Sequence, residues 1–430
     1  MEALSDGGML KYGNYLPCPK EPKSWQLLVN WLPEGLAPKR FGGRAFYYEH
    51  PKAEIPPGFI ERKKIYVFHY LMNFGFGLAK LLEKLGISSE IHVIRTIMDG
   101  IPPPKDNHLL IKDLRFDKIE VRIYQPKTPT TGRRRGVLYF HGGVGQFGSI
   151  RAYERTCRYF AKKSDSVFVS VGYRLAPEYP FPTQFEDCLA AAVHFMRIAE
   201  DYGVDPARVI TCGDSSGGTL AAAVAQAMTN RKDLPKLRAQ MLIYPFLQAA
   251  NFNLPSYEQN RGVPVLLKKR TLSLGLKYIN KEQSAIDEIL KHAHIPRDLE
   301  LKYKEWLNSD NIPEDFKPRD YQEGKENQIS EDLYRSFKPF LDPVFSPLLA
   351  EDTVIAQLPE TFILSCEFDV LRDDALMYKN RLENHGIKVT WCHLEQGFHG
   401  IIFLASYGRI TSFKSANKGL RMIVDFLKSI

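Results

Sequence analysis

Residues 209–218 read Val209-Ile210-Thr211-Cys212-Gly213-Asp214-Ser215-Ser216-Gly217-Gly218. This stretch joins a short, β-prone apolar run to an Ala-rich, helix-forming run at 219–228 through the pattern G-x-S-x-G, centred on Ser215. A glycine-flanked serine between a strand and a helix is typical of a nucleophile elbow, a tight turn that presents the serine at the end of a strand. The alternative interpretation is a Gly- and Ser-rich connection without chemistry.

The overall composition is that of a globular protein with a large core. The chain has 430 residues, of which 44% are apolar and 25% charged. Its net charge of +8 is mild for this length, and the one tight basic cluster, at 133–135, is interpreted as a solvated turn. We therefore expect no nucleic-acid partner. The six cysteines include no C-x-x-C pair, which argues against a zinc or thioredoxin-like site.

The order of apolar runs predicts an α/β protein with an insertion. Short apolar strands alternate with helices over 106–250 and again over 341–430, which predicts a mainly parallel central sheet with helices on both faces. The more polar residues 251–340 interrupt this alternation and are interpreted as a cap insertion. We expect residues 1–60 to form an irregular leader and residues 61–105 to form a helical N-terminal cap segment.

One early segment suits either the protein or a lipid surface. Residues 65–82 are the most hydrophobic early stretch, but His69, Asn73 and Lys80 interrupt them, which argues against a membrane-spanning helix. The stretch predicts an amphipathic helix that covers the active-site mouth or lies on a membrane surface. Residues 1–23 lack the apolar core of a signal peptide.

A serine nucleophile needs a base, and the base needs an orienting acid. In a strand–elbow–helix architecture these follow the serine in the order acid, then histidine. Asp369 stands just past the predicted strand at 361–366, where it can orient an imidazole. His399 stands between glycines, after the predicted strand at 388–392. We therefore predict a triad of Ser215, Asp369 and His399.

A glycine-rich segment after another predicted strand suits an oxyanion hole. His141-Gly142-Gly143-Val144 directly follows the apolar run at 137–140. Backbone N–H groups of Gly142, Gly143 and Ser216, together with that of Val144, are expected to hold a carbonyl oxygen that becomes negative. Taken alone, the segment is equally typical of a strand-to-helix turn.

The combined motifs resemble the hormone-sensitive-lipase branch of the α/β-hydrolases, and more narrowly the arylacetamide deacetylase-like family. The resemblance covers roughly residues 60–430. The motifs that carry it are His141-Gly142-Gly143, Tyr173-Arg174-Leu175-Ala176-Pro177-Glu178, Phe185-Glu186-Asp187, Gly213-Asp214-Ser215-Ser216-Gly217-Gly218, Asp369-Val370-Leu371-Arg372-Asp373-Asp374 and Gly397-Phe398-His399-Gly400. One position departs from the family pattern, because Val144 stands where the family commonly has a third glycine.

The resemblance implies an α/β-hydrolase fold and an esterase, amidase or lipase activity. It implies Ser215 as nucleophile, Asp369 as acid and His399 as base. The motif-supporting residues would be His141, Gly213, Asp214 and Gly217. It also implies that no metal and no cofactor take part. Members of the family usually begin with a short apolar signal-anchor, so the resemblance implies a protein of the endoplasmic reticulum membrane. Because this sequence begins with a polar leader instead, the alternative expectation is a cytoplasmic protein.

Three functions remain open from the sequence. The first is a serine hydrolase that cleaves small-molecule esters or amides with small to medium apolar acyl groups. The second is an interfacial lipase acting on neutral lipid esters, which the aromatic stretch at 68–76 favours. The third is a non-catalytic ligand-binding protein on the same fold.

Overall fold

The computed structural model describes residues 52–318, 321, 329–408 and 411–430. Most of the predicted leader, residues 1–51, lies outside this range. Its described part, residues 52–60, contains neither helix nor strand.

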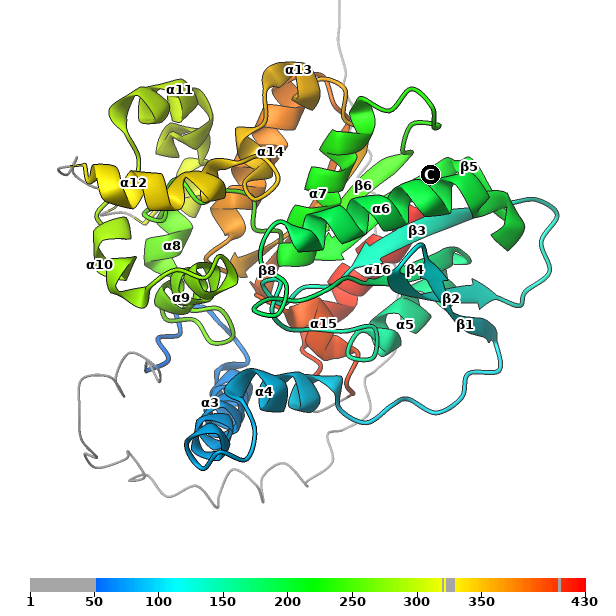
Figure 1. The fold of residues 1–430 in the computed structure, drawn as a ribbon, viewed down its shortest axis with the longest axis horizontal. Coiled ribbons are helices and arrows are strands. Elements are labelled where there is room, and N and C mark those ends of the chain that lie inside the picture. Colours follow the sequence, from blue (N-terminus) through cyan, green and yellow to red (C-terminus); the bar gives the residue numbers. More distant parts are fainter. Residues whose placement is uncertain (1–51, 319–320, 322–328, 409–410) are drawn as a thin grey trace, which may run out of the picture. The chain divides into compact units, whose positions relative to one another are not determined.

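A single eight-stranded sheet forms the centre of the protein (Figure 1). Its strand order is β1-β2-β4-β3-β5-β6-β7-β8. The strands are β1 (Leu109–Phe116), β2 (Ile119–Pro126), β3 (Arg134–Phe140), β4 (Val167–Gly172), β5 (Val204–Asp214), β6 (Ala239–Ile243), β7 (Glu360–Phe368) and β8 (Val389–Phe398). β1 pairs with β2, and β2 with β4, in antiparallel fashion, while the pairs from β4 through β8 are parallel. The predicted fold class, an α/β-hydrolase fold with a mainly parallel sheet, is confirmed.

The central strands β3, β4 and β6 are buried on both faces, and their side chains alternate between two cores. In β3, Leu138 and Phe140 enter the core under α6 (Thr183–Ile198), α7 (Ser216–Thr229) and α14 (Arg372–Asn384). The intervening Val137 and Tyr139 enter the core under α5 (Glu154–Ser164) and α16 (Lys414–Ser429). A strand buried on both faces reads as an unbroken apolar run, which is why the sequence pattern indicates it.

The segment between β6 and β7 is helical and includes the predicted insertion at 251–340. Figure 1 shows most of its helices grouped beside the β7–β8 end of the sheet, away from β1 and β2. Its helices are α8 (Pro255–Gln259), α9 (Lys268–Tyr278), α10 (Ile286–Ile289), α11 (Arg297–Leu307), α12 (Glu331–Phe337) and α13 (Asp352–Ile355). Several of its apolar side chains, including Leu272 and Phe345, join the core that α7 and α14 also share. A short helix, α15 (Ile401–Ala405), follows β8.

In the described part of the chain, helices α3 (Arg62–Lys84) and α4 (Glu90–Asp99) precede the sheet, and they pack on each other. The Ser89 side chain accepts a hydrogen bond from the His92 N–H at 3.3 Å and so caps the start of α4. On α4, Arg95 donates to the carbonyls of Gln146 and Ala176, at 2.8 and 2.7 Å, and forms an ion pair with Glu178. The helical pair is thereby fixed to the loops that follow β3 and β4.

Helix α7 begins unusually close to β3. A Cβ atom added at Gly217 would lie 2.1 Å from the carbonyl oxygen of Phe140 and 2.7 Å from that of His141. Only a residue without a side chain permits this approach, which sets the height of the α7 N-terminus above the sheet.

We predict that Gly217→Ala lowers the free energy of unfolding by about 1–3 kcal/mol, because the new methyl group must push α7 away from β3. Gly132→Ala is the matched control, since a Cβ there would meet nothing within 4 Å. Urea denaturation measures both variants. Equal stability of the two would contradict the close approach.

Candidate active site

Ser215 lies in the turn between β5 and α7. Its backbone has φ +56° and ψ −125°, a region that residues with a side chain rarely adopt. The turn closes because Gly213 has no side chain, since a Cβ there would lie 2.1 Å from the Gly217 carbonyl oxygen. The Ser215 N–H donates to the Ile243 carbonyl at 2.9 Å, which ties the turn to the end of β6.

His399 and Asp369 meet the Ser215 side chain. His399 Nε2 lies 2.8 Å from Ser215 Oγ, and His399 Nδ1 lies 2.8 Å from Asp369 Oδ2. Asp369 directly follows β7 and His399 directly follows β8, so neighbouring strands bring the residues to one edge of the sheet. Both are buried, with 2% and 6% of their surface exposed. The structure thus brings together the three residues that the motif order predicts.

The Asp369 loop is held by a buried polar network. The second oxygen of Asp369 accepts from the Leu371 N–H at 2.9 Å, and Asn260 Nδ2 donates to the Asp369 carbonyl at 3.0 Å. Next to it, the fully buried guanidinium of Arg372 pairs with Glu367 at 2.9 Å and with Asp373 at 3.0 Å. This network restricts the carboxylate to the position from which it meets His399.

A second carboxylate, Asp214, lies directly before Ser215 and is fully buried. Its Oδ1 accepts hydrogen bonds from the Tyr139 hydroxyl and the Gly142 N–H, and its Oδ2 from the Tyr153 hydroxyl, each at 3.0 Å. Burial raises the pKa of Asp214, while these three hydrogen bonds act in the opposite direction. Asp214 therefore ties the serine turn to the glycine-rich loop after β3.

His141 supports the same loop from below. Its ring stacks on that of Tyr173 with centroids 4.3 Å apart, and the Tyr173 hydroxyl donates to the His141 carbonyl at 2.6 Å. Burial lowers the pKa of His141 to about 4, so its imidazole is neutral at physiological pH. His141 therefore packs against Tyr173 and supports the loop, whereas His399 is the histidine that contacts Ser215.

The expected oxyanion donors differ in availability. Gly142 donates its N–H to Asp214, which differs from the expectation that it faces a substrate. Val144 donates its N–H to Ser216 Oγ at 2.7 Å. Among the described residues, the N–H groups of Gly143 and Ser216 have no protein acceptor. The loop bends sharply here, with φ +118° at Gly143 and φ +57° at Val144. The second value is unusual for a β-branched residue.

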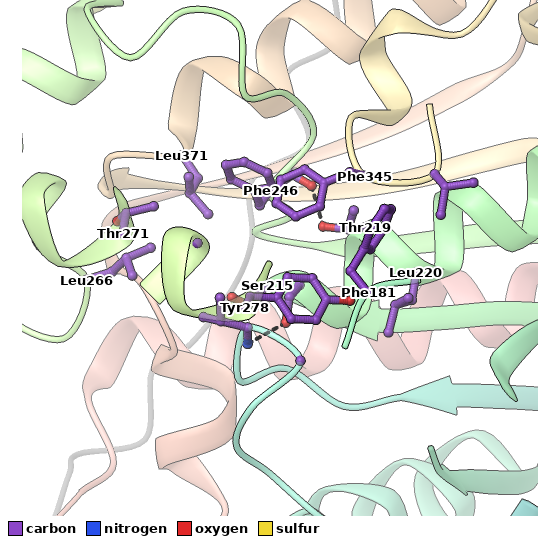
Figure 2. Close-up of a pocket in the computed structure, with 15 residues that line it drawn as sticks. Phe181, Ser215, Thr219, Leu220, Phe246, Leu266, Thr271, Tyr278, Phe345 and Leu371 are labelled. Carbon is purple, nitrogen blue, oxygen red and sulfur yellow. Dashed lines mark hydrogen bonds between the residues drawn. The ribbon is translucent and has the colours of Figure 1, made fainter. Parts of the chain in front are cut away.

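An apolar cavity of about 60 Å³ opens beside Ser215. Figure 2 shows aromatic rings around it from four parts of the chain. They are those of Phe181, Phe246, Tyr278 and Phe345. The rings of Phe181 and Phe246 each meet that of Phe345 edge to face, with centroids 5.6 Å apart. Val144 contributes an aliphatic wall, so the lining of the cavity is mainly apolar.

Sequence reasoning did not find the aromatic residues of this cavity, nor Tyr139, Tyr153 and Asn260. Their positions lack a motif or a periodic pattern, because they meet only after the chain has folded. Within the described part of the chain, no group of three or more His, Cys, Asp or Glu side chains could hold a metal ion.

Comparisons with known proteins identify similar sequences. A family model for the alpha/beta hydrolase fold matches residues 137–302 and 307–403. The chain is 43% identical to human arylacetamide deacetylase-like 4 over 378 residues, which are 88% of this chain and 92% of that protein. It is also 40% identical to arylacetamide deacetylase-like 3 of Mus musculus over 90% of this chain and 93% of that protein. With arylacetamide deacetylase of Bos taurus it shares 40% identity over 83% of this chain and 89% of that protein.

Solved structures share the fold at lower identity. Carboxyl esterase 2 of the fungus Tuber melanosporum superposes with a TM-score of 0.58 at 20% identity, over 77% of this chain and 88% of that one. A thermostable esterase from Pseudomonas putida gives a TM-score of 0.59 at 20% identity, over 83% and 96% of the two chains.

We predict that Tyr153→Phe lowers the free energy of unfolding by about 1–3 kcal/mol at neutral pH, because Asp214 loses a hydrogen bond in a buried site. The loss shrinks on acidification. The raised pKa of Asp214 means that the folded state takes up a proton readily, and a neutral carboxyl needs the hydroxyl less.

Tyr159→Phe is the control for this substitution, because Tyr159 lies on the adjoining α5 and its hydroxyl bonds to no other described residue. Denaturation at pH 5 and pH 8 measures both variants. A Tyr153→Phe loss that does not change with pH would contradict the role given to Asp214.

Proposed function

The chain belongs to the arylacetamide deacetylase-like proteins of the α/β-hydrolase family, and on that premise we propose that it cleaves carboxylic esters or amides through an acyl-enzyme on Ser215. Hydrolases of this family act on small-molecule esters or amides. The observation that carries the proposal is the pair of 2.8 Å contacts that connect Ser215, His399 and Asp369 on a strained turn.

In the first step, Ser215 Oγ attacks the substrate carbonyl carbon while His399 Nε2 takes the hydroxyl proton. Asp369 accepts from Nδ1, fixes the tautomer that leaves Nε2 free, and stabilises the imidazolium that forms. The carbonyl oxygen becomes negative and accepts hydrogen bonds from the N–H groups of Gly143 and Ser216, a role supported by the lack of a protein acceptor for either group among the described residues. His399 then returns the proton to the leaving alcohol or amine.

In the second step, water attacks the acyl-enzyme. His399 again takes a proton, this time from the water molecule, and gives it to Ser215 Oγ as the acid leaves. No step requires a group other than these side chains and water.

The acyl side of the substrate is the part that the cavity limits. Aromatic and aliphatic side chains line it, and it offers few polar partners, which favours an apolar acyl group over a charged one. Seven of its fifteen lining residues lie between β6 and β7, the region that we propose acts as the cap.

We predict that Ser215→Ala lowers kcat for short p-nitrophenyl esters by about 10⁴-fold or more and abolishes covalent labelling by a fluorophosphonate, because the nucleophile is gone. Ser429→Ala, at the exposed end of α16, is the control for loss of a serine hydroxyl. Labelling that persists in Ser215→Ala would overturn the assignment. A well-folded native chain without any labelling would favour the non-catalytic binding function instead.

A specific surface favours a second candidate, a hydrolase that works at a lipid interface. Ten of the fourteen exposed large apolar residues among the described residues lie at 60–101. Five of them repeat at helical spacing along one face of α3, namely Tyr70, Leu71, Phe74, Leu78 and Leu81, and Leu85 directly follows the helix. By length and composition, α3 is the one helix in the described part of the chain that could cross a membrane.

We propose that the face of α3 formed by these five residues, together with Leu85, lies on a membrane, and that the membrane is that of the endoplasmic reticulum. The helix also carries exposed basic side chains near both ends, Arg62 and Lys63 at one and Lys84 at the other, which suit lipid headgroups. On its other side, Phe76 and the α4 residue Ile91 pack near Leu274 of α9. Because α9 also lines the cavity through Thr271 and Tyr278, a lipid surface on α3 would lie near the substrate entrance.

We predict that the double substitution Leu71→Ser and Phe74→Ser weakens binding to phosphatidylcholine vesicles about tenfold or more, because two large apolar side chains no longer enter the lipid. Vesicle flotation measures the change, and turnover of a soluble ester checks that the site is intact.

Leu301→Ser with Ile329→Ser is the matched control, since these exposed residues lie outside α3 and α4. Equal vesicle binding by both double variants would remove α3 as the lipid-binding face.

A further inference from the structure

The corner of the cavity beside Ser215 contains an unassigned hydrogen-bond donor, the side chain of Ser216. Ser216 Oγ accepts the Val144 N–H at 2.7 Å. A hydroxyl that accepts one hydrogen bond keeps its own hydrogen and can donate it. Among the described residues, no atom accepts a hydrogen bond from Ser216 Oγ. Ser216 lines the cavity and is partly exposed to it, so this hydrogen is available to a bound substrate.

The surrounding donors fix where that hydrogen is useful. Gly142 has given its N–H to Asp214, and Val144 has given its N–H to Ser216, so two of the four donors expected for an oxyanion are already in use. The free donors are the N–H groups of Gly143 and Ser216. The Ser216 hydroxyl belongs to the same residue as one of these two N–H groups. The N–H of Val144 is engaged by Ser216 Oγ, and the O–H of Ser216 can take its place as a donor to the substrate.

The backbone of Val144 has a positive φ at the point where its N–H donates to Ser216 Oγ. With φ +57°, a valine adopts a conformation that suits glycine, and its N–H is fully engaged by Ser216 Oγ. A hydroxyl that accepts a hydrogen bond becomes a better donor, because the bonds in a chain polarise one another. The hydrogen bond from Val144 therefore makes the Ser216 hydroxyl a stronger donor towards the cavity.

Resting on the proposed function, we propose that the Ser216 hydroxyl donates a hydrogen bond to the oxyanion during acyl transfer. As Ser215 Oγ bonds to the carbonyl carbon, the carbonyl π bond breaks and its electron pair moves to oxygen, while the Ser215 proton goes to His399. The negative oxygen accepts hydrogen bonds from Ser216 O–H, Ser216 N–H and Gly143 N–H. Ser216 keeps its proton throughout, and the electron pair returns when the leaving group departs.

Two roles of the Ser216 hydroxyl, blocking the Val144 N–H or donating to the oxyanion, predict opposite changes in the rate when the hydroxyl is removed. If Ser216 Oγ only blocks the Val144 N–H, its removal frees a backbone donor and raises the rate. If the hydroxyl donates to the oxyanion, its removal lowers the rate. Ser216→Ala keeps the backbone donor of residue 216 and places a good helix former in the first turn of α7, so the variant isolates the hydroxyl.

We expect Ser216→Ala to lower kcat for p-nitrophenyl acetate about 10- to 100-fold with KM changed less than about twofold, because the donor acts mainly in the transition state. A boronic acid inhibitor, which mimics the tetrahedral state, should lose affinity by a similar factor. Ser216→Thr retains the hydroxyl and should restore most of kcat. Thr229→Val, at the far end of α7, is the control for a lost hydroxyl on this helix.

The outcomes separate the inference from the function beneath it. Unchanged or higher kcat in Ser216→Ala would overturn the hydroxyl's role while the native chain still hydrolyses esters. Equal losses in Ser216→Ala and Ser216→Thr, with KM rising and inhibitor affinity unchanged, would reduce it to a packing residue. A native chain that neither labels with fluorophosphonate nor hydrolyses the ester would overturn the proposed function itself, and the role of Ser216 with it.

Discussion

The geometry of the site depends on the hydrogen bonds that the buried carboxylate of Asp214 accepts. Asp214 is the last residue of β5, and its three hydrogen bonds reach β3, the loop after β3 and the residue that precedes α5. Because a buried charge is costly unless every lone pair is satisfied, the three donors and the serine turn are held in one relative arrangement. The position of the glycine-rich loop against Ser215 therefore follows from the need to solvate one carboxylate.

A second network of buried carboxylates fixes the chain just after Asp369. Asp374 is fully buried and accepts the Leu247 N–H and the Gln248 side chain, each at 3.0 Å, and burial raises the pKa of Asp374 to about 7. Asp373 accepts the Ser256 N–H at 2.6 Å. These carboxylates join α14 to the segment that follows β6, which includes the cavity residue Phe246. One acidic run, 369–374, thus orients His399 through its first residue and positions the cavity wall through its last two.

Residues with local signatures were predictable from the sequence. Buried parallel strands such as Val167–Val171 read as apolar runs, and the turn at Ser215 is marked by glycines that a tight bend requires. Asp369 and His399 follow from chain order and from their places after strands. The occupied N–H of Gly142 and the ring of Phe345 beside Phe246 were not predictable, because they depend on side chains that meet across long stretches of sequence. The bonds of Asp373 and Asp374 to the segment after β6 were not predictable for the same reason.

The division of labour between strand ends and the segment after β6 has an evolutionary consequence. Ser215, Asp369 and His399 sit at the ends of β5, β7 and β8, whereas Phe246, Tyr278 and Phe345 belong to the chain between β6 and β7. Substitutions of these three aromatic residues alter the shape of the cavity, and none of the three supplies a contact that links Ser215, His399 and Asp369. Duplicated copies of such a gene can therefore diverge in the acyl groups that they accept through changes at a few cavity positions, while keeping the same three polar side chains.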